Sequence, residues 1–117
     1  LIYALREGLR MVQEEGLDNR HSRHRSMAGL LWSGLESLGF ELHVTKEHRL
    51  PMLTTPVLYS KIDDAAIRSK LLDDYNIEIA GGFGPLAGKV WRIGLMGHSS
   101  RRENVVLLLA ALGDLIK

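Results

Sequence analysis

The spacing of apolar residues predicts four helices. The first opens the chain and is interrupted at Gly16, and the second ends just before Gly39, because glycine is common at the position that follows a helix. The third follows Asp63 and Asp64, whose charges favour the positive end of a helix, and Asn76 suits a left-handed C-cap. The four apolar stripes are Leu5, Leu9 and Val12; Met27, Leu31, Leu35 and Leu38; Ile67, Leu71 and Tyr75; and Val105, Leu109, Leu112 and Ile116.

The fourth helix has an N-terminal signal of its own. Ser100 and Glu103 stand three residues apart at its predicted start, which is the pattern of a capping box. In that arrangement each side chain accepts a hydrogen bond from a backbone N–H that the helix leaves free. We therefore expect Ser100 to be the N-cap of this helix.

Four shorter segments predict strands: Phe40–Val44, Met52–Ser60, Ile77–Ala80 and Lys89–Met96. Pro56 removes a backbone donor, so the second strand should lie at a sheet edge or carry a bulge. The element order is then α-α-β-β-α-β-β-α. Strands joined by tight connections pair antiparallel, and we expect an α+β fold in which a small antiparallel sheet has its helices packed on one face.

Composition excludes several classes of function. The 117 residues are 45% hydrophobic and 25% charged, as in an ordinary globular domain. The formal net charge of +1 does not favour nucleic acid or an anionic membrane as a partner, and the longest apolar run, Val105–Leu112, is too short to span a bilayer. The absence of cysteine excludes disulfides and thiolate metal sites and fits a reducing compartment.

The chain starts with residues that already follow a helical pattern and does not begin with methionine, so we interpret it as a piece of a longer protein.

Arg92 stands in the middle of the last predicted strand. Successive strand side chains point to opposite faces, so Trp91, Ile93 and Leu95 are expected on the core side. Arg92 shares the other face with Gly94, whose missing side chain would open a space on the sheet. An arginine sunk among apolar neighbours without a partner costs several kcal/mol, so an anion should meet it.

Two interpretations of Arg92 follow. A guanidinium holds a carboxylate through two parallel hydrogen bonds, which fixes the position of the bound group. The simpler alternative is that Arg92 pairs with a resident acid such as Glu78, or that it extends along the surface to water. The sequence pattern alone favours the simpler alternative.

The glycine-rich loop resembles two nucleotide-binding motifs only in part. Gly82–Ala87 fits the pattern G-x-G-x-x-A after a strand, but a strand follows it and no helix N-terminus is available for a pyrophosphate. Gly88–Val90 lacks the Ser or Thr of a P-loop. The glycines therefore allow a tight connection or a close approach of the backbone to a ligand.

Five segments carry a family resemblance: "YALREGL", "EEGLDNR", "RLPMLTT", "DDYNIEIAGGFGPLAGKVWRIGLMG" and "RRENVVLLLAAL". In this order they resemble the C-terminal small domain of the class V, fold-type I pyridoxal-phosphate aminotransferases, most of all the alanine–glyoxylate and serine–pyruvate aminotransferases. The resemblance covers essentially the whole chain. It implies that residues 1–16 are the end of a connecting helix from a large domain, and that residues 17–117 form the small domain.

The resemblance implies an enzyme that moves an amino group from alanine or serine to glyoxylate or pyruvate. In this family the arginine of the motif "KVWRIG", here Arg92, binds the α-carboxylate of the substrate, and the loop with Gly81 and Gly82 would lie beside the site. The Schiff-base lysine and the ligands of pyridoxal phosphate belong to the large domain. We therefore expect no catalytic residue, cofactor ligand or metal ligand in this chain, and no activity from the chain alone.

The family resemblance also implies partners and a location. The expected partners are a small amino acid or 2-oxo acid, the large domain and a second subunit of a homodimer, with no nucleic acid and no membrane. We expect a cytoplasmic enzyme, or in a eukaryote one from an organelle such as the peroxisome. Three positions depart from the family pattern, His21, Pro56 and His98, and His98 is expected to affect the preference for the amino donor.

Two further interpretations remain beside the family assignment. His21 and His24 are three residues apart on a predicted helix, as metal ligands are, but the arginines around them would repel a cation, so a solvated basic face is expected. From a different class of function, the chain would be a free-standing, non-catalytic α+β module that binds a small carboxylate or a partner protein through Arg92.

Overall fold

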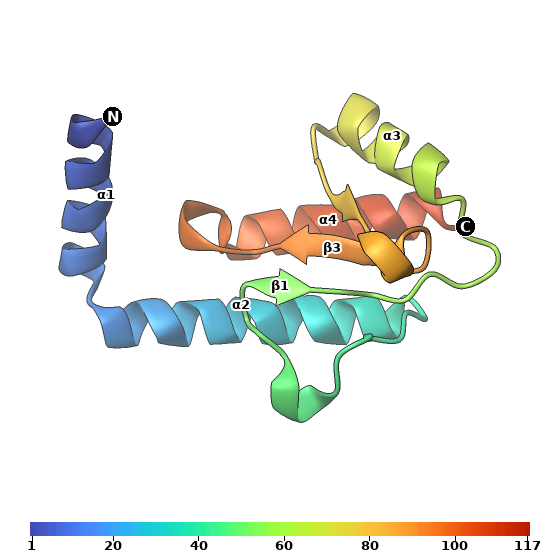
Figure 1. The fold of residues 1–117 in the computed structure, drawn as a ribbon, viewed down its shortest axis with the longest axis horizontal. Coiled ribbons are helices and arrows are strands. Elements are labelled where there is room, and N and C mark those ends of the chain that lie inside the picture. Colours follow the sequence, from blue (N-terminus) through green and yellow to red (C-terminus); the bar gives the residue numbers. More distant parts are fainter.

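The computed structural model describes all 117 residues and contains four α-helices and three short strands (Figure 1). The helices are α1 (Ile2–Glu15), α2 (Leu17–Ser37), α3 (Asp64–Tyr75) and α4 (Arg102–Leu115). The strands are β1 (Leu53–Thr54), β2 (Ala80–Gly81) and β3 (Trp91–Gly94). Three 3₁₀ turns cover Lys46–His48, Gly84–Leu86 and Gly97–Ser99.

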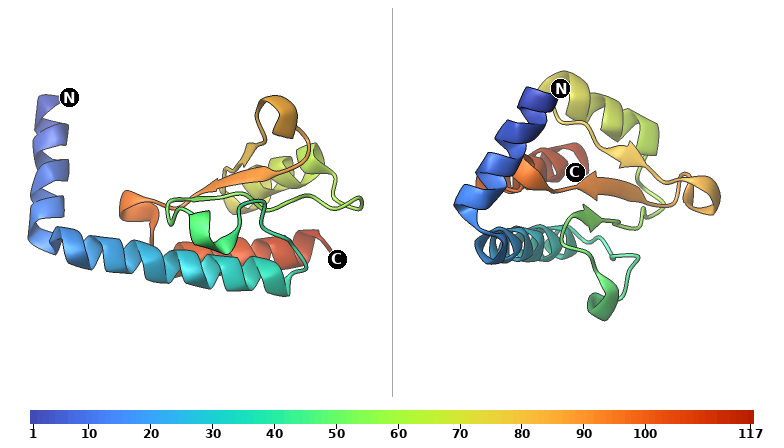
Figure 2. Two further views of the ribbon diagram at one scale, coloured as in Figure 1. Left: turned by 60° about the horizontal axis from the view of Figure 1, so that its bottom comes forward. Right: turned by 60° about the vertical axis from the view of Figure 1, so that its left-hand side comes forward.

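The strands form one antiparallel sheet in the order β1-β3-β2. Thr54 of β1 lies opposite Ile93, and Gly81 of β2 lies opposite Trp91. Helices α2, α3 and α4 contribute to one core with the inner face of this sheet, and Figure 2 shows α2 and α4 running side by side beneath the strands. The predicted α+β architecture is confirmed. Pro56 follows β1, which lies at an edge of the sheet as expected.

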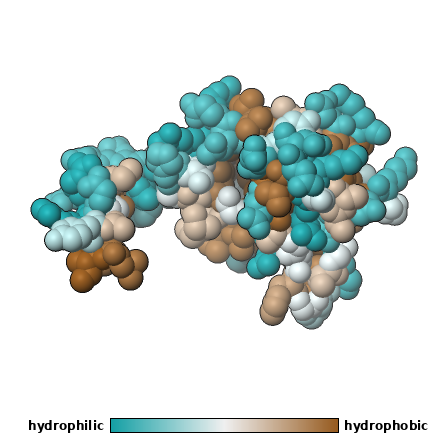
Figure 3. All heavy atoms as spheres, turned by 90° about the horizontal axis from the view of Figure 1, so that it is seen from above, coloured by the Kyte–Doolittle hydropathy of each residue, from teal (hydrophilic) through white to brown (hydrophobic).

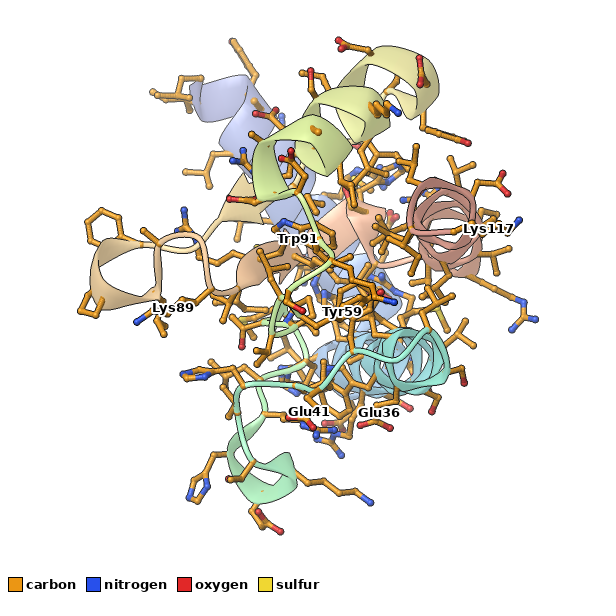
Figure 4. The ribbon with its side chains drawn as sticks, turned by 90° about the vertical axis from the view of Figure 1, so that its right-hand side faces the viewer. Glu36, Glu41, Tyr59, Lys89, Trp91 and Lys117 are labelled. Atoms are coloured by element: carbon orange, nitrogen blue, oxygen red, sulfur yellow. The ribbon has the colours of Figure 1, made fainter.

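The core gathers around the inner face of β3. Trp91 is fully buried, and its ring centroid lies 5.6 Å from that of Phe40. Figure 4 shows Trp91 between α3 and Tyr59. Helices α2 and α4 approach closely because Gly34 has no side chain, and a Cβ at that position would lie 2.2 Å from a methyl carbon of Leu109. The buried core residues are Leu31, Leu35, Phe40, Ile67, Leu71, Ile79, Trp91, Ile93, Leu95, Val105, Leu108, Ala111 and Leu112.

The helix ends agree with the sequence signals in α3 but not in α4. Asp63 is the N-cap of α3 and its carboxylate accepts a hydrogen bond from the Ala66 N–H at 3.0 Å, while Asn76 has the left-handed φ of 54°. The predicted capping box of α4 is wrong. Arg101 is the N-cap, and Ser100 is buried with its Oγ unpaired. The preceding 3₁₀ turn places Ser100 inside the fold, one residue too early for the cap.

The predicted strand Phe40–Val44 is also wrong. This segment is extended, and its side chains alternate between covered and exposed positions, but only one bridge, from Leu42 to Pro56, links it to the sheet. Two backbone bonds flank the bridge, from His43 N to Thr55 O and from Val57 N to Glu41 O. No second bridge continues this pairing, so the segment does not form a strand.

Helix α1 stands apart from the rest of the molecule (Figure 1). Gly16, with φ of 80°, turns the chain between α1 and α2, and no residue of α1 is buried. Its apolar side chains Ile2, Leu5 and Leu9 are 81%, 63% and 60% exposed. Figure 3, which looks along this projecting helix from above, shows hydrophobic residues gathered on one side of it. None of the helices combines the length and the apolar character that crossing a membrane requires.

Candidate functional site

The strand register gives Arg92 the predicted face of the sheet but not the predicted surroundings. Trp91, Ile93 and Leu95 are at most 5% exposed and point into the core, whereas Arg92 is exposed on the opposite face. The expectation that Arg92 is sunk among apolar neighbours is therefore wrong. The helices pack on the core face, which leaves the guanidinium in contact with water.

Arg92 is held by the backbone at one nitrogen only. Its Nε donates a hydrogen bond of 2.8 Å to the carbonyl oxygen of Gly81, in the neighbouring strand β2. Neither Nη1 nor Nη2 has a protein partner, and no acidic side chain forms an ion pair with Arg92. The alternative pairing with Glu78 is thus wrong, whereas the other form of that alternative, an arginine that extends along the surface to water, agrees with the exposure of Arg92. The bond to Gly81 restricts the plane of the guanidinium and leaves the edge formed by Nη1 and Nη2 free, which is an edge that can bind a carboxylate with two hydrogen bonds.

The two candidate loop glycines have different structural roles. A Cβ at Gly82 would lie 1.9 Å from the carbonyl oxygen of Leu86, so only glycine fits the tight turn that returns the chain to β3. A Cβ at Gly81 would be at ordinary contact distance, 3.5 Å, from the guanidinium of Arg68. Gly82 therefore shapes the loop, while Gly81 supplies the carbonyl that holds Arg92.

The space predicted above Gly94 is partly filled. The methyl carbon of Met96 lies 3.5 Å from the place where a Cβ of Gly94 would stand, so this side chain covers the gap. Val90, which simple alternation assigns to the face of Arg92, is 2% exposed and forms a bridge with Val57. The open part of the face around Arg92 is therefore shorter than the sequence pattern predicts.

Sequence reasoning missed a polar cluster on the core side of β2 and β3. Asp64 Oδ1 accepts a hydrogen bond of 2.8 Å from the indole Nε1 of Trp91 and another of 2.6 Å from Nε of Arg68. The pKa of Asp64 is lowered, first by the hydrogen bond from Arg68 and then by that from Trp91, while partial burial opposes the shift. The same carboxylate raises the pKa of Arg68. The spacing of Asp64 and Arg68, four residues apart on a helix, is the signal that predicts this pair.

The basic run of α2 is only partly the solvated face that the sequence predicts, because His21 and Arg25 are exposed whereas Arg20 and Arg23 form ion pairs. Arg20 and Arg23 both pair with Glu15, at 2.9 and 2.5 Å, and Arg23 also donates to the carbonyl oxygens of Gly97 and Ser100. The pKa of Glu15 falls to about 2, mainly through the hydrogen bond from Arg23 and secondarily through that from Arg20. This network ties the junction of α1 and α2 to the turn before α4.

The histidines named from the sequence lie in different environments. His24 is engaged at both ring nitrogens, with Nδ1 at 2.7 Å from the Arg20 carbonyl and Nε2 accepting from the Gly97 N–H at 2.9 Å. No nitrogen of His24 is therefore free to share a metal with His21, which is exposed. His98 is exposed in the turn Gly97–Ser99, with its Nδ1 2.9 Å from Nη2 of Arg101.

The residues of this chain do not fit a cofactor site by themselves. A lysine that forms a Schiff base is activated by an apolar or cationic pocket. All five lysines are instead exposed: Lys46, Lys61, Lys70, Lys89 and Lys117. The chemistry that the structure offers is that of Arg92, a fixed cation with a free planar edge.

No family model matches the chain. Individual proteins match it closely in sequence. It is 46% identical over 112 residues to the (S)-ureidoglycine–glyoxylate transaminase of Bacillus subtilis, covering 96% of this chain and 27% of that protein. It is 44% identical over 117 residues to the alanine–glyoxylate aminotransferase of Callithrix jacchus, covering 99% of this chain and 28% of that protein.

Solved structures agree with these relatives. The alanine–glyoxylate aminotransferase of Nostoc sp. superimposes with a TM-score of 0.96 at 50% identity, covering 98% of this chain and 30% of that one. A pyridoxamine–pyruvate aminotransferase from Mesorhizobium loti superimposes with a TM-score of 0.84 at 25% identity, over 91% of this chain and 27% of that one. The chain thus spans less than a third of the length of the proteins that it matches.

Proposed function

We propose that this chain, which belongs to the family of the alanine–glyoxylate and ureidoglycine–glyoxylate aminotransferases, is the part of such an enzyme that binds the substrate carboxylate. Arg92 is the binding residue. The observation that carries the proposal is its single anchored nitrogen, with Nε on the Gly81 carbonyl and both Nη atoms free. The loop that contains Gly81 and Gly82 lies beside this site.

The role of Arg92 is orientation. A transaminase acts on an amino acid in one half of its cycle and on a 2-oxo acid in the other, and both substrates carry a carboxylate next to the reacting carbon. Two parallel hydrogen bonds from Nη1 and Nη2 hold that carboxylate in a fixed plane, which restricts the rotation of the substrate about the reacting carbon. Pyridoxal phosphate, bound by the rest of the enzyme, supplies the electron sink and carries the amino group. No residue of this chain is assigned to proton transfer.

The substrates proposed are small. The relatives named above use glyoxylate by their names, and we assign glyoxylate or pyruvate as the amino acceptor and alanine or serine as the donor. Arg92 does not separate these acids, because it contacts only the carboxylate that they share. His98, exposed in the turn Gly97–Ser99, is assigned an effect on donor preference only.

The remainder of the enzyme is proposed to cover α1. Residues 1–16 would be the end of a connecting helix from a large domain, and residues 17–117 the small domain. Support comes from the unburied apolar residues Ile2, Leu5 and Leu9, and from relatives that are more than three times as long as this chain. We assign the cofactor site and the contacts of a homodimer to this larger part. The 117-residue chain alone is accordingly proposed to be inactive.

The proposal is tested by Arg92→Lys in the full-length enzyme. Lysine keeps the charge and loses the planar fork, so we expect kcat/KM to fall about 10- to 100-fold for both substrates, the range of a hydrogen bond to a charged group. The absorbance of the bound cofactor should stay unchanged. Arg102→Lys, an exposed arginine in α4, is the matched control and should leave the kinetics unaltered. Normal kinetics with Arg92→Lys would refute the proposal.

A further inference from the structure

A carboxylate on α3 lies on the core side of one cross-strand pair, bonded to one member directly and facing the other through an arginine. Gly81 of β2 and Trp91 of β3 lie opposite each other, and their side-chain directions point to the core face of the sheet. Asp64 accepts the indole N–H of Trp91 directly. It also binds Arg68, whose guanidinium would lie 3.5 Å from a Cβ at Gly81 and so faces this residue from the core side of the sheet.

The same Gly81 determines where Arg92 points. Its carbonyl oxygen is the only protein acceptor for the guanidinium of Arg92, at 2.8 Å from Nε. β2 has two residues and lies at the edge of the sheet, so few other contacts fix its height relative to β3. A shift of Gly81 therefore carries Nε with it and rotates the plane of the guanidinium.

We propose that Asp64 is a positioning residue for Arg92, which acts by fixing the Gly81–Trp91 pair from the core face of the sheet. This inference rests on the proposed function of Arg92. Asp64 touches no substrate in this arrangement. It sets the direction of the free Nη edge on the opposite face.

Charge and burial explain why a carboxylate suits this place. Asp64 is the first residue of α3, where a negative charge is favoured by the helix dipole. One oxygen receives two donors, from Trp91 and Arg68, and the second oxygen lies 3.4 Å from Nη2 of Arg68. An amide at this position retains an acceptor for the indole but loses the charge that holds Arg68 on the core side of Gly81. An alanine loses both contacts.

A double-mutant cycle in the full-length holoenzyme tests the inference. The four proteins are the unaltered enzyme, Asp64→Ala, Arg92→Lys and the double variant, assayed with L-alanine and glyoxylate. We expect Asp64→Ala to lower kcat/KM about tenfold, mainly through KM, because the free Nη edge of Arg92 is then no longer held in the direction of the carboxylate. In the Arg92→Lys background, Asp64→Ala should change kcat/KM less than about twofold, since the guanidinium that Asp64 positions is already absent.

The outcomes separate this inference from the proposed function. If Asp64→Ala lowered kcat/KM equally in both backgrounds, or in neither, the positioning role of Asp64 would be overturned. Arg92 would remain the proposed carboxylate-binding residue. Unaltered kinetics of Arg92→Lys would instead refute carboxylate binding by Arg92, and this inference with it. Asp64→Asn keeps the acceptor for Trp91, so it should fold even if Asp64→Ala does not, and it should lose less than the alanine variant. Asp74→Asn, at an exposed position of the same helix where the aspartate side chain forms no hydrogen bond or ion pair, is the control and should match the unaltered enzyme.

Discussion

The sharpest structural prediction concerns the two neighbouring loop glycines. A carbon atom and a carbonyl oxygen approach each other to about 3.3 Å, so a Cβ on Gly82 at 1.9 Å from the Leu86 oxygen requires a displacement of about 1.4 Å. The atom in the way belongs to the backbone and cannot rotate aside. The same oxygen accepts a hydrogen bond from Lys89 N at 3.0 Å, which the displacement would break.

The expected cost of Gly82→Ala follows from these two effects. Overpacking contributes about 2 kcal/mol, and the lost hydrogen bond about 1 kcal/mol. The free energy of unfolding of the chain should therefore fall by about 3 kcal/mol, which corresponds to roughly 12 °C in Tm for a domain of this size. Gly81→Ala is the matched comparison, because its Cβ would meet only the flexible Arg68 side chain at 3.5 Å.

Thermal unfolding followed by circular dichroism measures both variants against the unaltered chain. Gly81→Ala should remain within about 1 kcal/mol of it, because the added Cβ makes only an ordinary contact with a flexible side chain. Two results would refute the reasoning. One is a Gly82→Ala variant that unfolds at the temperature of the unaltered chain. The other is an equal loss of stability in both variants, which would show that the close approach of the Leu86 carbonyl is not the cause.

Two further predictions concern helix ends and pH. Asp63→Ala removes the side-chain acceptor for Ala66 N and should lower the free energy of unfolding by about 1 kcal/mol in urea titrations, whereas Asp63→Asn should be nearly neutral. The pKa of Glu15 is lowered from 4.5 to about 2, so its pairing with Arg23 stabilises the fold above pH 4.5 and is lost as the pH falls towards 2. The Tm difference between the unaltered chain and Glu15→Gln should thus be constant above about pH 5 and narrow below pH 4.5; a difference that grows in acid would contradict this pairing.

The helices could be predicted because their signals are local. The apolar stripe with Leu31 and Leu35 in α2, the cap at Asp63 and the left-handed Asn76 each depend on residues within a few positions. The failed cap at Ser100 has a distant cause, since Arg23, more than seventy residues away, binds the Ser100 carbonyl and helps to fix the turn before α4. No local pattern contains that contact.

The candidate site likewise combines a feature that the local sequence predicts with features that distant contacts decide. The period of the strand assigned Arg92 to the face opposite Trp91, which the structure confirms. Its exposure depends on which face the helices cover, and the Nε bond depends on the register that places Gly81 next to β3. The hydrogen bond from Trp91 to Asp64 joins residues 27 positions apart. Tertiary packing decides all three features, so the sequence alone could not supply them.

The most direct test of the central claim is a structure of the full-length holoenzyme with a bound substrate acid. The account predicts that the two carboxylate oxygens lie within hydrogen-bond distance of Nη1 and Nη2 of Arg92, while Nε remains on the Gly81 carbonyl. An acid bound elsewhere in the enzyme, or an Arg92 whose Nη atoms pair with an acidic side chain in the complete protein, would contradict it.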